Sequence, residues 1–289
     1  MAYEEYLGRT ESREDRMDPR LAEGMAATLG QPLPPPGEDL PPLWHWMLFQ
    51  DWRPAGGLGP DGHPQRGGFL PPVHHLERRM WAGGRLTFQG GLRVGDTLRR
   101  TSTILRIDQK AGGSGELVFV TVRHALEGPR GPVLEEEHDI VYRGTGGAAL
   151  REAPAAPDWL EARRATVLPD AVALFRYSAL TGNGHRIHYD HPYVTGVEGY
   201  PGLVVHGPLQ ATWLAAHALA LAREERGPGA RLARFAFRGL RAAIAGRPLT
   251  LLGQWEKKGE KKGGTGARLR LETRDDTGAT CQAAEADLA

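Results

Sequence analysis

One segment, residues 209–221, would be apolar on nearly every side if it formed a helix. One face carries Leu209, Trp213, Ala216 and Ala220, and another carries Leu214, Ala218 and Leu221. A helix of this kind has to be buried on most sides. It is far too short an apolar run to cross a membrane. A sheet that curls around one central helix would bury it, so the segment predicts an α+β architecture.

Strand-like runs follow this helix and also fill the first half of the chain. They alternate in polarity and are rich in β-branched residues. They span 85–89, 97–108, 116–126 and 133–143 in the first half, and 232–237, 248–257, 267–273 and 280–286 in the second. The segments between them also correspond, since GGLRVGDTLRR resembles RGLRAAIAGRPLTL. Matching order at a separation of about half the chain predicts two copies of one unit.

The length of 289 residues fits two such units. We therefore predict a double hotdog, in which each unit has a curved antiparallel sheet wrapped around a central helix. Residues 1–35 are expected to be a polar N-terminal segment, and 36–150 an N-terminal hotdog that shapes the binding pocket. Residues 151–289 would form the hotdog that carries the chemistry. The Gly, Ala and Pro-rich stretch 144–159 is the expected linker.

Charge and cysteine content exclude several classes of protein. The net charge of +1 provides no basic field for nucleic acid. The single cysteine, Cys281, cannot form an intramolecular disulfide, which suits a reducing compartment. Because the N-terminus is charged and lacks an apolar core, we expect no signal peptide there. We expect a cytoplasmic protein that binds neither nucleic acid nor membrane, and association into homo-oligomers is left open.

The stretch 175–209, just before the apolar helix, concentrates polar groups suited to catalysis. It contains His185, His188, His191 and His206 among glycines and prolines. Histidine titrates near neutral pH, and the start of a helix offers free N–H groups to negative charge. The spacing of the first three histidines would bring them together around a metal only if they lay on a helix. Gly184 and Pro192 make a helix unfavourable there. Without CxxC or HExxH patterns, we expect no metal.

The same stretch carries a family resemblance. Residues 177–193, YSALTGNGHRIHYDHPY, resemble the signature loop of the MaoC-like (R)-specific enoyl-CoA hydratases, Gly-Asp-x-Asn-Pro-(Leu/Ile)-His-x-Asp-x-x-Tyr. VVHGPL at 204–209 resembles the start of that family's central helix. LGPDGHPQRGGFLPPV and RMWAGGRLTF are similar to a two-hotdog subgroup, which includes mesaconyl-CoA and itaconyl-CoA hydratases and type 2 hydroxyacyl-thioester dehydratases. The positions that match the signature are Gly182, Ile187, His188, Asp190 and Tyr193.

The resemblance implies a hydro-lyase that adds water to, or removes it from, a short, dicarboxylic acyl-CoA. His188 would be the general base and acid, and the Gly207 N–H would stabilise the enolate. Asn183 stands where the family has its catalytic Asp, and would position the water. Coenzyme A enters as part of the substrate, and no separate cofactor is implied. The residues expected to contact substrate are Arg186, Tyr189, His206 and Asp190, with Arg186 a candidate for the free carboxylate.

Three alternatives share the fold. The first is a 3-hydroxyacyl-thioester dehydratase of fatty-acid metabolism, which would accept a long apolar chain. The second is a hotdog that binds acyl thioesters without turnover, because Asn183 cannot act as an acid. The third is a thioesterase, which would release free thiol.

Overall fold

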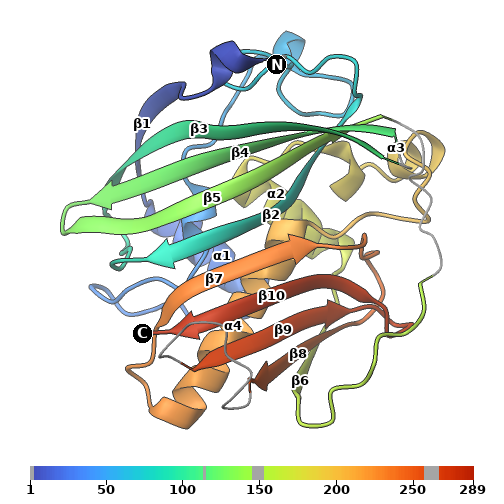
Figure 1. The fold of residues 1–289 in the computed structure, drawn as a ribbon. Coiled ribbons are helices and arrows are strands. Elements are labelled where there is room, and N and C mark those ends of the chain that lie inside the picture. Colours follow the sequence, from blue (N-terminus) through green and yellow to red (C-terminus); the bar gives the residue numbers. More distant parts are fainter. Residues whose placement is uncertain (1–2, 113–114, 145–152, 257–266) are drawn as a thin grey trace.

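A computed structural model describes residues 3–112, 115–144, 153–256 and 267–289. All ten strands of this described part belong to one antiparallel sheet, in the order β1-β3-β4-β5-β2-β7-β10-β9-β8-β6. The helices α1, α2 and α4 lie on one side of this sheet (Figure 1). None of the described helices has the length and apolar character needed to cross a membrane.

The first five strands form the N-terminal unit together with one α-helix. Its strands are β1 (Thr10–Arg16), β2 (Arg78–Phe88), β3 (Thr97–Gly112), β4 (Gly115–Gly128) and β5 (Gly131–Arg143). Helix α1 (Pro19–Leu29) follows β1, and three short 3-10 helices are η1 (Glu4–Tyr6), η2 (Trp44–Met47) and η3 (Ala55–Gly57). The apolar segment at 43–50, where the repeat places a counterpart of the central helix, thus forms only one 3-10 turn.

The remaining five strands form the C-terminal unit around a long helix. Its strands are β6 (Arg163–Val167), β7 (Leu232–Gly239), β8 (Leu249–Trp255), β9 (Arg268–Arg274) and β10 (Thr280–Leu288). Its helices are α2 (Ala171–Thr181), η4 (Arg186–His188), α3 (His191–Gly196) and α4 (Gly207–Arg226). Helix α4 contains the apolar segment that we predicted, and ten of its residues are buried.

The strand order confirms the predicted repeat. The N-terminal unit runs β1-β3-β4-β5-β2 and the C-terminal unit runs β6-β8-β9-β10-β7, so equivalent strands occupy equivalent places. The two units join where β2 pairs with β7, with Gly84 opposite Phe237. A double hotdog therefore describes the fold. The long central helix occurs only in the C-terminal unit of the described chain.

The N-terminal segment 1–35 departs from our expectation. Strand β1 pairs with β3 from Thr10 to Arg16, and the side chains of Met17 and Met25 are buried in the main core. Helix α1 packs against α2. Residues 10–29 are therefore an integral part of the N-terminal unit, equivalent to β6 and α2 of the other. Within the expected linker 144–159, residues 145–152 lie outside the described part of the chain.

Candidate active site

The histidine-rich loop is shaped by a helix end and by close contact with the N-terminal unit. Helix α2 ends at Gly182, whose φ of 62° lies in the left-handed region that favours glycine. Two residues later, Gly184 meets Gly62 of the other unit so closely that a Cβ on Gly62 would lie 2.0 Å from the Gly184 oxygen. The backbone N–H of Arg186 donates to the backbone carbonyl oxygen of Asp61 at 2.8 Å. The loop is thereby held between the two units.

His188 is buried and held in one tautomer. Its Nδ1 lies 2.7 Å from the carbonyl oxygen of Val204. Because a carbonyl only accepts hydrogen bonds, Nδ1 carries the proton and Nε2 is left as the basic atom. Burial lowers the pKa of His188 to about 4. The ring is therefore neutral at pH 7 and able to accept a proton.

His206 supports His188 from behind. The two rings are stacked, with centroids 3.6 Å apart and planes inclined by 20°. His206 is fully buried, and its Nε2 lies 2.8 Å from Ser178 Oγ. Burial lowers the pKa of His206 well below its ordinary value, so this ring is neutral as well. His206 does not line the cavity described below, and its ring packs directly on that of His188.

Helix α4 begins at Gly207, directly after His206, with Pro208 in its first turn. The N–H groups of a first helical turn have no partner within the helix, and the helix dipole places positive potential there. Pro208 is suited to this position because it has no N–H to leave unpaired. Gly207 lines the same cavity as His188. A base and a site for negative charge therefore face one space.

The N-terminal unit contributes an acid and a histidine that our sequence analysis did not identify. His63 Nδ1 lies 2.9 Å from Asp61 Oδ2, and the His63 ring centroid is 4.2 Å from that of His185. His185 in turn meets His188 edge-on at 5.5 Å. Burial lowers the pKa of His63, against the opposing effect of Asp61. Asp61, His63 and His185 also offer ligand atoms within 4.8 Å of one another, so this trio is the group able to hold a metal ion among the described residues.

The seven residues predicted from the sequence divide into two groups. Asn183, His188 and Gly207 line the cavity. Arg186, Tyr189, Asp190 and His206 do not. Arg186 is ion-paired with Asp190 at 2.7 Å, and Asp190 also caps α3 by accepting from the Tyr193 N–H. The Tyr189 hydroxyl donates to the Gly184 oxygen at 2.9 Å.

The cavity has a volume of about 1030 Å³ and lies between the two units. Its size is at the upper end of the range of about 300–1,000 Å³ that is usual for small-molecule sites. Both histidines and arginines line it. The arginines in the wall are Arg13, Arg53, Arg79, Arg100, Arg143 and Arg241. Such a wall suits a large ligand with several negative charges.

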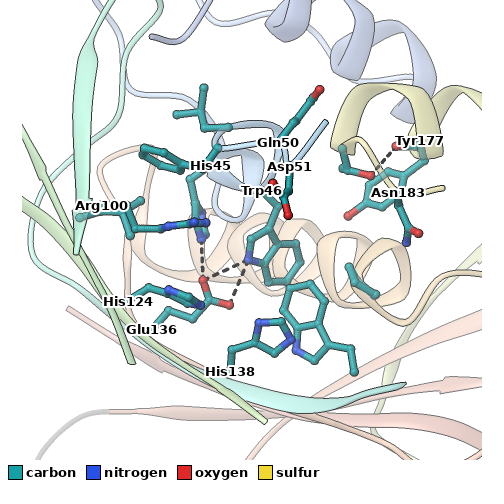
Figure 2. Close-up of a pocket in the computed structure, with 16 residues that line it drawn as sticks. His45, Trp46, Gln50, Asp51, Arg100, His124, Glu136, His138, Tyr177 and Asn183 are labelled. Atoms are coloured by element: carbon teal, nitrogen blue, oxygen red, sulfur yellow. Dashed lines mark hydrogen bonds and ion pairs between the residues drawn. The ribbon is translucent and has the colours of Figure 1, made fainter. Parts of the chain in front are cut away.

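A smaller pocket of about 220 Å³ adjoins the cavity on the side of the N-terminal unit. Asn183 and Pro208 line both spaces. Figure 2 shows Arg100, His124 and His138 on one side of this pocket, with Tyr177 and Asn183 opposite. We expected the N-terminal unit to shape the acyl pocket, and the structure adds that it does so with ionisable side chains. No local sequence pattern marks Arg100, His124 and His138, because they come from three different strands, β3, β4 and β5.

Comparison with known proteins identifies the family. The model of the family described as hydroxyacyl-thioester dehydratase type 2 matches residues 43–245. The chain belongs to this family. It is 43% identical to mesaconyl-C(4)-CoA hydratase of Chloroflexus aurantiacus, over 98% of this chain and 96% of that one. It is 25% identical to the mitochondrial hydroxyacyl-thioester dehydratase type 2 of Schizosaccharomyces pombe, over 73% of this chain and 77% of the relative.

The type 2 hydroxyacyl-thioester dehydratase match extends over both units. It begins at Leu43, before η2, and ends at Ala245, after α4 and β7, so it includes both walls of the cavity. A solved MaoC-like dehydratase superposes with a TM-score of 0.69 over 99% of each chain, at 14% identity. This likeness confirms the MaoC-like hotdog fold. Membership of the family makes the protein a hydro-lyase.

Proposed function

We propose that the protein adds water across the double bond of a short enoyl-CoA whose acyl group bears a free carboxylate, as in mesaconyl-C4-CoA. The observation that carries the reaction type is the neutral His188 facing the same cavity as the start of α4. The substrate class is supported by the 43% identity to mesaconyl-C(4)-CoA hydratase. The reverse reaction, dehydration of a 3-hydroxyacyl thioester, would use the same groups.

Water activation falls to His188. The water oxygen bonds to the β-carbon while one water proton passes to His188 Nε2, and the carbon–carbon π electrons move toward the thioester. Asn183 lies in the cavity wall beside this point and offers an amide group to hold the water. Its Oδ1 already accepts from the His185 N–H at 3.0 Å, which fixes the amide plane.

The negative charge that develops on the thioester oxygen is stabilised at the start of α4. The Gly207 N–H donates to this oxygen, and Gly207 has no side chain to obstruct the approach. The enolate then takes a proton at the α-carbon, which His188 can return. The net change is the addition of one water, with no redox step. The arginines of the cavity wall, apart from Arg100, would hold the phosphate groups of coenzyme A.

Asp61 and His63 act as a positioning pair for this chemistry. Asp61 accepts hydrogen bonds from both the backbone N–H and the ring Nδ1 of His63, at 3.1 and 2.9 Å. These bonds hold the pKa of Asp61 far below its ordinary value despite burial, so it is ionised. The fixed His63 ring packs on His185, which borders His188. The N-terminal unit thereby sets the orientation of the catalytic loop.

Changing Asp61→Asn should lower kcat by about tenfold, because the amide keeps the shape of the carboxylate but not its charge. Dialysis against a chelator should leave the wild-type rate unchanged, since the Asp61–His63 hydrogen bond engages atoms that a metal would need. Steady-state rates measure both effects. Asp158→Asn, at an exposed ion pair with Arg164, makes the same change elsewhere and should have no effect. A rate lost on chelation and restored by a divalent metal would instead assign the trio to metal binding.

A panel of thioesters tests the proposed function. Purified protein is mixed with crotonyl-, mesaconyl-C4-, itaconyl- and a long-chain enoyl-CoA, and the products are analysed by mass spectrometry. Gain of one water on the esters with a free carboxylate is the expected result. Water gain only on the long chain would indicate a fatty-acid dehydratase. Free coenzyme A would indicate a thioesterase, and binding without conversion a non-catalytic hotdog.

A further inference from the structure

The small pocket beside Asn183 is not used by the acid–base steps above. It lies between strands of the N-terminal unit and the end of α2, and it shares Asn183, Pro208 and Arg100 with the main cavity. Its volume of about 220 Å³ is below the usual size of a whole ligand site, so it suits a group of a few atoms. Its walls are unusually rich in charged and polar side chains for such a buried position.

The acidic side chains of this pocket are already engaged. Glu136 is buried, and its carboxylate lies 3.1 Å from His45 Nε2 and accepts from Trp46 Nε1 at 3.1 and 3.2 Å. The charge and hydrogen bond of His45 lower the pKa of Glu136 to about 2 in spite of its burial. Asp51 is ion-paired with Arg53 at 3.0 Å and with Arg13 at 3.4 Å. Each of the two carboxylates therefore already has a hydrogen-bonded or ion-paired partner.

Arg100 is the positively charged residue in the lining of this pocket, and its N–H donors are not all used in hydrogen bonds. Its nearest carboxylate is Glu11, at 3.7 Å, which is beyond hydrogen-bond distance. Its buried Nε has no hydrogen-bond partner among the described residues. The guanidinium lies over the Phe49 ring, with 4.7 Å to the centroid, and its side chain is 19% exposed. A guanidinium remains charged in proteins, and its fork of N–H groups matches the two oxygens of a carboxylate.

Two histidines flank Arg100 in the pocket wall. His124 holds Ser102 Oγ through Nδ1 at 2.9 Å, and His138 packs on Trp81 with ring centroids 3.9 Å apart. Burial lowers the pKa of His124 to about 3 and that of His138 to about 4. Both rings are therefore neutral at pH 7, and they add hydrogen-bonding capacity without opposing or duplicating the charge of Arg100.

We propose that Arg100 binds the free carboxylate of the acyl group and so selects substrates that carry one. This inference rests on the proposed function. In mesaconyl-C4-CoA the free carboxylate is attached to the β-carbon, the atom that receives water. With the β-carbon beside His188 and Asn183, the carboxylate points away from the thioester and enters the next space, which is the pocket beyond Asn183. Arg186, which the sequence offered as one candidate for this carboxylate, is paired with Asp190.

The test compares esters that differ only in this carboxylate. 3-Methylcrotonyl-CoA is mesaconyl-C4-CoA with a methyl group in place of the carboxylate. Arg100→Gln should lower kcat/KM for mesaconyl-C4-CoA by about 100-fold and leave that for 3-methylcrotonyl-CoA within a few-fold. Arg100→Lys keeps the positive charge but not the forked pair of N–H donors, so its kcat/KM for mesaconyl-C4-CoA should lie between those of the wild type and Arg100→Gln. Arg99→Gln is the matched control, since Arg99 is the exposed neighbour paired with Glu14, and both esters should react as with the wild type.

A binding measurement separates this proposal from the proposed function. Succinyl-CoA and butyryl-CoA are unreactive and again differ by a carboxylate and a methyl group at one position. Calorimetry should show the wild type preferring succinyl-CoA, and Arg100→Gln should abolish the preference. The assignment of Arg100 would be overturned if a folded Arg100→Gln variant lost kcat/KM equally for both substrates, or affinity equally for both ligands. It would also be overturned if the variant lost neither. Wild-type protein that binds succinyl-CoA preferentially through Arg100 but hydrates no ester would overturn the proposed function alone.

Discussion

Changing His188→Gln should lower kcat/KM for the carboxylate-bearing enoyl-CoA by at least about 100-fold. Glutamine is close in volume to histidine, and its NH2 group can still donate to the Val204 oxygen that now receives Nδ1–H. It has no basic nitrogen, however, so the attacking water would keep its proton. Stopped-flow or steady-state hydration rates measure the loss. His191→Gln, at an exposed position at the start of α3, is the matched control and should react like the wild type.

The pH dependence provides an independent check on the same residue. Because burial lowers the pKa of His188 to about 4, the free enzyme holds the basic form throughout the neutral range. The wild-type kcat/KM should stay level as the pH falls from 8 to about 5, and should decrease below that as His188 gains a proton. A decrease centred near pH 6.5, the ordinary value for histidine, would contradict the assignment, as would near-wild-type turnover by the His188→Gln variant.

Changing Gly207→Pro should lower kcat by about 100- to 1,000-fold, the usual effect of removing one donor to a developing oxyanion. Proline removes the N–H and is compatible with the first position of a helix. The preceding residue, His206, already has the extended conformation that a following proline requires, with φ −56° and ψ 133°. The helix should therefore form as before, and thermal denaturation measures whether it does.

Gly207→Ala separates the loss of the donor from the added bulk. Alanine keeps the N–H, and its Cβ would find only Gln282 Oε1, at 4.0 Å. The alanine variant should hydrate substrate within a few-fold of the wild type. If both variants lose activity equally, the space around Gly207 matters and the N–H does not. If the proline variant is folded and fully active, the thioester oxygen is bound elsewhere.

Much of the fold could be predicted because its central parts have strong local patterns. Helix α4 is apolar all round, and the strands alternate clearly. Helix α2 escaped prediction because Val172 and Phe175 on its outer face are exposed, so no polar face opposes the buried one. Strand β1 escaped because it is a sheet edge made of TESREDR, in which every side chain is polar. Its place depends on pairing with β3, some ninety residues away in the sequence, which no local window contains.

The residues of the candidate site also fall into those that a local motif predicts and those that only the packing of the two units brings in. Asn183, His188 and Gly207 lie within one short stretch of the chain, so a single motif contains them. His63 and Arg100 lie about a hundred residues before that stretch and reach the site only because the two units pack together. The contact of Gly62 with Gly184 and the pairing of β2 with β7 create this proximity. The family resemblance of residues 58–73 covers His63 but does not indicate that this ring meets His185, and no pattern around Arg100 indicates that it reaches the site.

The absence of a long helix from the N-terminal unit of the described chain has a consequence for stoichiometry. Two identical hotdogs paired along one sheet would be related by a twofold axis and would present two equivalent helix starts, hence two sites. Within the described residues α4 is the one long helix, and its first residues, Gly207 and Pro208, line the large cavity. We therefore expect a chain of this design to turn over one thioester at a time, and titration with a tight ligand should saturate at one equivalent.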